Sequence, residues 1–246
     1  MAEQEVAKHT KNLLGAVVAK HPLAHKVREI LLEMAVIVFA VSISIWFHSM
    51  GEHRHEQAQV RTFLLGLKRD IQSDMSQLDA VVAFHHGADQ HYAWLAALDP
   101  AAAPDPATFE PTYTFIHANN FLIPRQGRYD GFKSAGKLTS IEDDHLLERI
   151  TEMYEYEIPK LKLSSGGWLG LQRALEDYLR ESITDDDSIE ARYAALTSRR
   201  GKLLLQRMVT FPQLYQRAAV LKEEAREIVR AIDAAYPDQA QTTKPH

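Results

Sequence analysis

The chain has 246 residues, a formal net charge of −5, 25% charged residues and no cysteine. This mildly acidic balance argues against a nucleic-acid partner, because nucleic-acid-binding domains carry a basic excess. The lack of cysteine excludes disulfides, thiolate catalysis and cysteine metal sites, and it fits a bacterial periplasm as well as a cytosol.

The most apolar stretch of the chain, ILLEMAVIVFAVSISIWF, runs from Ile30 to Phe47. A membrane-spanning helix needs roughly 20 mostly apolar residues, because the hydrocarbon core is about 30 Å thick. Residues 34–41 are apolar on every face and lack the one-sided stripe of a surface helix. We therefore predict a transmembrane helix over 30–50, with Glu33, Trp46 and Phe47 at the membrane interfaces.

Two other interpretations of this stretch stay open at this point. The first is a buried core helix of a soluble protein. The second is a cleaved signal peptide, which is disfavoured because the apolar part runs into Trp46 and Phe47 without a small-x-small cleavage site. We interpret the stretch as an uncleaved signal anchor.

Residues 1–29 precede the span as an N-terminal tail. Residues 2–20 place apolar side chains on one broad face together with lysines, so they form either an amphipathic helix on the membrane surface or a frayed tail. More lysine and arginine residues lie close before the span than close after it, which favours a cytoplasmic N-terminus. We expect a single-pass protein of the bacterial inner (cytoplasmic) membrane whose C-terminal domain is periplasmic.

After the span the helical pattern continues, and Gly51 is its only weak point. Apolar residues recur with heptad spacing from Val60 to Val81, a coiled-coil-like pattern in which Asp74 interrupts one core position. Additional apolar residues widen this face, which favours packing against later helices of the same chain over packing against a second copy. We predict a stalk helix over 51–98.

The segment after the stalk is rich in proline and alanine. Four prolines between 99 and 111 predict a loop, and a short helix is expected over 113–122. A second short helix is expected over 128–135, with Gly136 in a left-handed conformation at its end.

The remaining part of the chain also has helical periodicity. Ser140 followed by Asp143 resembles a capping box at the start of a helix. Pro159 and Gly166-Gly167 indicate a kink or short loop, and 237–246 is expected to be a disordered tail. No stretch alternates with a period of two. The predicted fold is therefore all-α: the transmembrane helix continues into the stalk, which packs in an antiparallel helical bundle over 51–236.

Three stretches carry a resemblance to a known family. The first is the apolar span that ends near Trp46 and is followed by a charged helix. The second is TFLLGLKRDI, which places an aromatic residue, two leucines, an aspartate and an isoleucine at Phe63, Leu64, Leu67, Asp70 and Ile71. The third begins at YDGFKSAGKLTSI, and its matching positions are Tyr129, Phe132, Ser134, Gly136, Leu138 and Ile141.

In this order of motifs the chain resembles a bacterial family of single-span proteins, domain of unknown function 6090. Ser44 and Ile45 stand where that family has asparagine before the tryptophan. The resemblance implies membrane anchoring and an α-helical domain. It brings no catalytic residue with it.

Two histidine clusters are candidate metal sites. His48, Glu52 and His55 lie on one helical stripe just after the span, and two imidazoles with a carboxylate are suitable ligands for Zn²⁺. A polar collar that titrates between pH 5 and 8 is the interpretation we prefer. The second cluster comprises His85, His86, Asp89 and His91, which the helix end explains without a metal. We assign neither a metal nor a cofactor.

No phosphate loop, nucleophile elbow or dinucleotide fingerprint occurs in the sequence. We expect a non-enzymatic scaffold or interaction protein of the bacterial envelope. Its expected partners are the lipid bilayer and either another protein or a second copy of the chain. The alternatives are a ligand-sensing domain that acts through a separate signalling partner, and an enzyme of unknown type.

Overall fold

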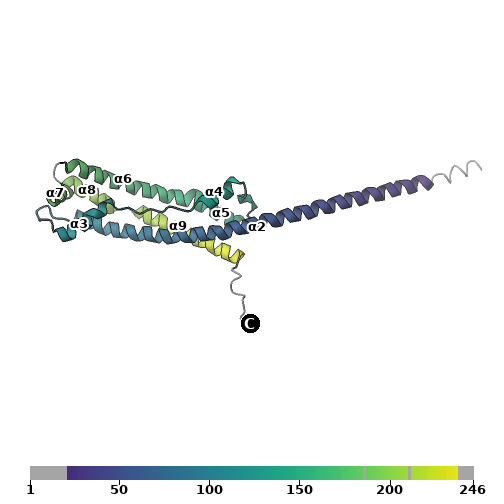
Figure 1. Cartoon of the computed structure of the whole chain (residues 1–246), viewed down its shortest axis with the longest axis horizontal. Coiled ribbons are helices and arrows are strands. Elements are labelled where there is room, and N and C mark those ends of the chain that lie inside the picture. The colour runs from purple at the N-terminus through teal and green to yellow at the C-terminus, as the bar shows by residue number, and fades with distance from the viewer. Residues whose placement is uncertain (1–20, 185–186, 210–211, 238–246) are drawn as a thin grey trace, which may run out of the picture. The chain divides into compact units, whose positions relative to one another are not determined.

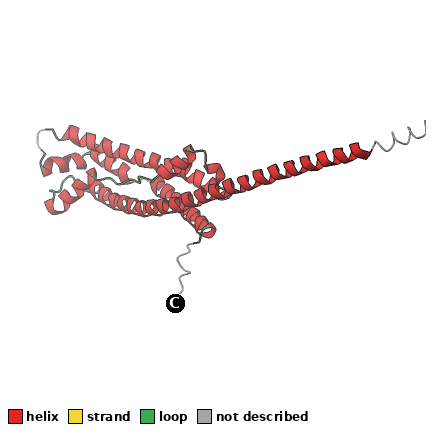
Figure 2. Cartoon of the chain, turned by 45° about the vertical axis from the view of Figure 1, so that its right-hand side comes forward, coloured by secondary structure: helices red, strands yellow, loops and turns green. Residues whose placement is uncertain are grey.

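The computed structural model describes residues 21–184, 187–209 and 212–237. All regular elements of these residues are helical and none is a strand (Figure 2). The predicted all-α fold is thereby confirmed. The amphipathic helix expected over 2–20 and the tail expected over 238–246 lie outside the described residues.

The chain divides into a first unit that ends at Ala58 and a second unit that starts at Gln59. The continuous helix α2 (His21–Ala96) supplies residues to both units. It is already helical at His21, ahead of the expected start at Ile30.

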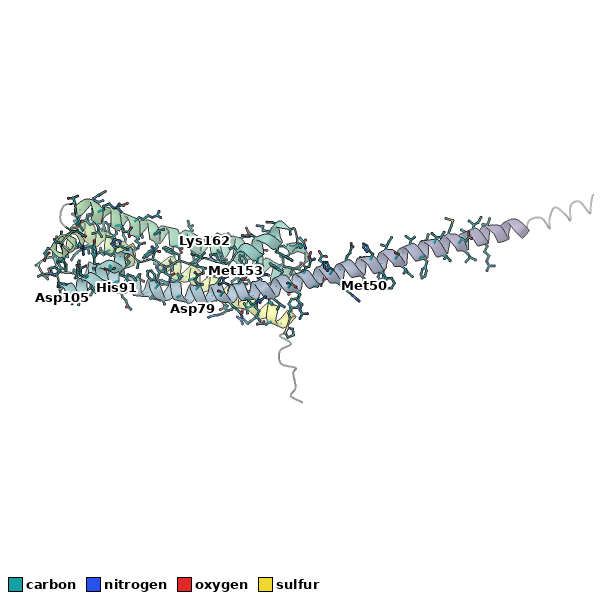
Figure 3. The ribbon with its side chains drawn as sticks, in the orientation of Figure 1. Met50, Asp79, His91, Asp105, Met153 and Lys162 are labelled. Atoms are coloured by element: carbon teal, nitrogen blue, oxygen red, sulfur yellow. The ribbon has the colours of Figure 1, made fainter. Side chains whose placement is uncertain are left out.

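Within the first unit, the large apolar side chains between Ile30 and Phe47 are exposed. The exposed fraction is 65% for Val36 and 67% for Phe39. The stretch is long and apolar enough to cross a membrane, and none of its most apolar window is buried. In Figure 3 the side chains on both sides of Met50 project freely from the ribbon. A core helix of a soluble protein buries at least one face, so this interpretation does not fit the first unit.

The second unit is a helical bundle. After α2 it contains α3 (Pro106–Thr114), η1 (Phe115–His117), α4 (Gly127–Ser134), η2 (Leu138–Ser140), α5 (Asp144–Glu152), η3 (Met153–Glu157), α6 (Ile158–Ser182), α7 (Ile189–Thr197), α8 (Arg199–Val209) and α9 (Pro212–Ala235). Of these, η3 is a π-helix and joins α5 to α6 without a loop.

Residues 118–126 contain no helix and are here called the return segment. Figure 1 shows this segment running back along the bundle, from the end that holds α3 to the end that holds α4. The helix expected over 113–122 is therefore wrong beyond His117. The carbonyl oxygens of Ile116 and Ala118 accept hydrogen bonds from the side chain of Gln172, so these carbonyls have partners outside the helix.

The loop expected over 99–111 is also shorter than predicted. α3 begins at Pro106, and the side chain of Asp105 accepts a hydrogen bond from the backbone N–H of Ala107 at 3.2 Å. Aspartate as the N-cap and proline in the first turn are a favoured start for a helix. The prolines of this stretch thus begin a helix as well as break one.

The return segment decides the direction of the later helices. Three side-chain pairs join α2 to α9. Their order along α9 is the reverse of their order along α2: Asp89 with Tyr215, Asp79 with Lys222, and Lys68 with Asp233. α9 is therefore antiparallel to α2, as expected. α6 instead runs in the same direction as α2, because the return segment brings the chain back before α6 begins (Figure 1).

Buried apolar side chains form two clusters along the bundle. The first joins α2 between Val60 and Leu78 to α4, α5, η3, the start of α6, and α9. The second joins α2 between Ala88 and Leu95 to α3, α6, α7 and α8. The heptad pattern read from the stalk therefore packs against helices of the same chain, and α2 contributes to both cores.

Two helix boundaries differ from the sequence prediction and one agrees with it. Asp143, and not Ser140, caps α5 by accepting a hydrogen bond from the N–H of Leu146 at 3.0 Å. α6 continues through Gly166 without a break. Gly136 has a φ of +68°, the left-handed conformation expected after α4.

Gly201 of α8 and Gly170 of α6 provide a matched test of packing. A methyl group at Gly201 would overlap the backbone carbonyl oxygens of Ala195 and Leu196, whereas nothing lies within 4 Å of one at Gly170. We expect Gly201→Ala to lower the free energy of unfolding by about 1–3 kcal/mol, because backbone atoms cannot rotate away. We expect Gly170→Ala to raise it by about 0.5–1 kcal/mol. Urea denaturation of both variants measures these changes, and equal effects would contradict the packing described for α7 and α8.

Candidate functional site

Four polar side chains of α2 contact the return segment and the start of α4. These are Asp70, Asp74, Gln77 and His85, here called the α2 polar row. The N–H of Arg125 donates to Asp74 Oδ2 at 3.0 Å, and the N–H of Ile123 donates to Gln77 Oε1 at 3.2 Å. Arg128 Nε donates to Asp70 Oδ2 at 2.8 Å, and the backbone of Asn120 faces the imidazole of His85 and raises its pKa, against the larger effect of burial.

The two chain segments match in length. From His85 to Asp70 the helix rises about 22 Å, at about 1.5 Å per residue. From Asn120 to Arg128 an extended chain covers about 26 Å, at about 3.3 Å per residue. Each member of the α2 polar row therefore lies opposite its own partner, and the return segment runs antiparallel to α2.

The other side of the return segment is held by α6. The buried Gln172 donates from Nε2 to the carbonyl oxygens of Ile116 and Ala118, at 2.7 and 2.9 Å. Lys162 Nζ, at the other end, donates to Gln126 Oε1 at 2.9 Å. An extended segment among helices has no regular backbone partner, so Gln172 supplies one to the backbone of Ala118, whereas Lys162 holds the side chain of Gln126.

Asp74, which interrupts the heptad, has a structural reason to do so. Its carboxylate accepts the N–H of Arg125 at the position where a leucine would leave that donor without a partner. Burial raises the pKa of Asp74, and the hydrogen bond from Arg125 opposes this shift. The side chain also borders an otherwise apolar cavity of about 20 Å³, which has room for about one water molecule.

The positions that carried the family resemblance meet in one place. Buried in the first core are Phe63, Leu64, Leu67, Ile71, Tyr129 and Ile141, and Phe132 and Leu138 pack against them. The rings of Phe63 and Phe132 stack with their centroids 3.9 Å apart. Ser134 lies exposed at the end of α4, apart from this group. Two stretches distant in sequence thus form one contact between α2 and α4.

Gly66 gives Arg128 its place on α2. A methyl group at Gly66 would overlap the guanidinium of Arg128, so the absence of a side chain allows Arg128 to lie across the helix and reach Asp70. Asp70 is one turn after Gly66, on the same face of α2. This explains why the aspartate of the second motif follows the glycine at that spacing.

A tyrosine pair links α4 to the π-helix η3. The rings of Tyr129 and Tyr154 stack 4.4 Å apart with an interplanar angle of 7°. Burial raises the pKa of Tyr129 to about 12, and burial together with Asp74 and Asp70 raises the pKa of Tyr154. Both phenols are therefore neutral near pH 7, and their role is packing rather than proton abstraction.

The histidine clusters do not converge on a common point. His48 Nε2 pairs with Glu52 Oε1 at 3.2 Å on an exposed surface. In the second cluster, His86 stacks on Tyr215, and the ring of His91 lies tilted by 30° to that of Phe115, each with ring centroids 4.4 Å apart. Among the described residues, no group of three or more histidine, aspartate or glutamate side chains is placed to hold a metal ion.

The helix end proposed for the second cluster is also incorrect. α2 continues to Ala96, so His85 and His86 lie well inside the helix. Their neighbours come instead from the packing of other segments: Asp89 accepts a hydrogen bond from Tyr215 at 2.6 Å, and His85 is buried against Trp168.

A polar surface hollow of about 280 Å³ lies between η1 and the C-terminal half of α6. The ionisable side chains in it are already paired. His117 Nδ1 lies 3.1 Å from Glu176 Oε1, and Arg192 Nε lies 2.6 Å from Asp187 Oδ1. Its charges therefore balance within the protein.

Several residues of the site escaped the sequence analysis. Gln77, Gln172 and Tyr154 were not recognised, because each stands at a position that helical periodicity assigns to an ordinary buried face. The one signal that the sequence offers for such residues is a polar side chain on a face that is otherwise apolar. Asp74 gave this signal.

Asp74 makes the stability of the bundle depend on pH. Since its pKa is raised in the folded protein, the protonated form is favoured there. The resulting stabilisation is full below the unfolded pKa of about 3.9 and is lost as the pH rises through the folded pKa. Relative to Asp74→Asn, the natural protein should therefore lose stability between acid and neutral pH. Urea midpoints across this pH range measure the difference in stability between the two proteins. Asp79→Asn controls for the lost charge. If the natural protein instead gains stability over Asp74→Asn as the pH rises, the assignment is contradicted.

Comparison with protein-family models, curated proteins and solved structures gives no match, so the resemblance to domain of unknown function 6090 stays a prediction.

Proposed function

We propose that the chain is a membrane-anchored helical interaction protein that acts as a scaffold or accessory subunit rather than as an enzyme. The observation that supports this most directly is the helical stretch from Ile30 to Phe47, whose apolar side chains are exposed in the first unit. Its partners are the lipid bilayer and either another protein or a second copy of the chain.

A lipid environment accounts for that stretch on two grounds. Each large aliphatic side chain gains roughly 1.5–3 kcal/mol when it leaves water, and none of the described residues covers the most apolar window of this stretch. The helix also satisfies its own backbone groups, which a segment in hydrocarbon must do. Following the charge difference across the span, we place the N-terminus in the cytoplasm and the second unit in the periplasm of a bacterial inner membrane.

The second unit supports a binding role. Polar side chains that catalysis would require are engaged in holding the return segment, as the contacts of Asp70, Asp74 and Gln172 indicate. Large apolar side chains stand exposed on three different segments of the unit: Ile123 at 77%, Leu163 at 71% and Val220 at 52%. These three side chains are accessible from outside the unit, which makes them positions from which contact with another protein can be detected.

The anchor is tested by placing charges in the apolar stretch. An arginine at the centre of a transmembrane helix costs about 2.5–3.5 kcal/mol on the insertion scale, so Val38→Arg with Val41→Arg should release the protein from membranes. Alkaline extraction followed by centrifugation measures the membrane-bound fraction. The matched variant with leucine at both positions should stay in the pellet. Release of the natural protein by the same treatment would contradict the anchor, and loss of an N-terminal tag would favour a cleaved signal peptide instead.

The interaction role is tested by photo-crosslinking in intact membranes. A photoreactive amino acid at Ile123, Leu163 or Val220 should give one discrete product, at twice the mass for a second copy or at another mass for a different protein. Dilution in detergent should abolish any product that arises from random collision. Recovery of monomer alone from all three positions would contradict an interaction role.

A further inference from the structure

His85 stands at the boundary between the two cores of the bundle. It is only 2% exposed, and its Nε2 atom has no hydrogen-bond partner. The first core uses α2 up to Leu78 and the second uses it from Ala88, so His85 lies between them. The imidazole is therefore a buried polar group that belongs to neither apolar cluster.

The surroundings of His85 are mostly aromatic. Its ring lies perpendicular to that of Trp168 of α6, with the centroids 4.8 Å apart. The ring of Phe121 in the return segment lies 6.0 Å away, and the neighbouring backbone of Asn120 faces the imidazole. One side chain thus joins α2 to both the return segment and α6.

The charged and titratable groups around His85 do not neutralise an imidazolium. On α2, His86 disfavours a second positive charge. Asp89, one turn further along, already accepts a hydrogen bond from Tyr215 of α9. Arg217 of α9 is bound to Lys160 O and Ser164 Oγ of α6, at 2.8 and 2.7 Å. The return segment contributes Asn120 and Phe121 at this point and no charge of its own.

We propose that His85 is an acid-sensitive latch, and that its protonation releases the return segment from α2. A neutral imidazole fits the aromatic enclosure, whereas an imidazolium requires water or a counter-ion that the enclosure does not provide. The return segment is the part that moves, because it is held only by side chains, while α2 and α6 keep their own backbone hydrogen bonds.

The direction of the pH effect follows from the burial of His85. Burial lowers the pKa of His85 below its ordinary value of 6.5. The neutral form therefore stabilises the closed state above pH 6.5, and this stabilisation is lost as the pH falls through the lowered pKa. Asp74, whose pKa is raised, acts with the opposite sign at the other end of the return segment. Protonation of Asp74 thus strengthens the closed state on acidification, whereas protonation of His85 weakens it.

The test is hydrogen exchange, measured by mass spectrometry on the full chain in detergent. Between about pH 7.5 and about pH 5.5, opening of 118–126 should rise about tenfold after correction for intrinsic exchange, because one pH unit below an unperturbed pKa is a factor of ten. Exchange in α9 between Leu221 and Ile232 is the internal reference, and its corrected rate should not show the rise expected for 118–126.

Three variants assign the effect to one residue. His85→Gln keeps an N–H group to face Asn120 without titrating and should abolish the rise, whereas His86→Gln and His91→Gln should retain it. A rise that persists in His85→Gln, or an equal rise in α9, would overturn the proposal.

A second readout serves if His85→Gln does not fold. With Trp46→Phe and Trp94→Phe, Trp168 is the remaining tryptophan, and its emission should shift to the red as the pH falls, with a midpoint below 6.5. An emission that does not change with pH would also overturn the latch.

Discussion

The bundle depends on one constraint, which is that an extended backbone packed among helices must find hydrogen-bond partners outside itself. The return segment meets this constraint with side chains from both of its neighbours: Gln77 and Asp74 of α2 each accept one of its N–H groups, and Gln172 of α6 donates to the carbonyl oxygen of Ala118. Unpaired backbone groups in the interior would cost about 1–3 kcal/mol each. The polar residues of α2 are thus a condition for the fold.

The same segment fixes the topology. In an up-and-down bundle each helix reverses the direction of the one before it, and short loops suffice. Here the extended return segment runs back along part of α2 and takes the place of a helix, so that α2 and α6 run in the same direction and α9 opposes them. Fewer residues cover the distance, because an extended residue advances more than twice as far as a helical one.

The sequence predicted the helical class, the extent of the second part of α2 and the left-handed Gly136, because these follow from local periodicity and backbone conformation. It failed on the return segment, where Tyr113 to His117 is helical and the residues that follow are not. That boundary depends on the hydrogen bonds from Gln77 and Gln172, which are separated from it by more than forty residues. Asp74 was noticed as an interruption, but its partner lies beyond the reach of any local pattern.

The π-helix η3 affects which side chains of the continuous helical segment α5–η3–α6 reach the two cores. In an α-helix, the side chains of neighbouring residues point about 100° apart, so a narrow buried face holds only one side chain of each neighbouring pair. In and directly after η3, Met153 is buried together with Tyr154, and Glu157 together with Ile158. The wider turn of the π-helix therefore changes the direction in which the following side chains point. It lets one uninterrupted helical rod present Tyr154 to one core and, farther along, Trp168 to the other without the loop that a change of direction would need.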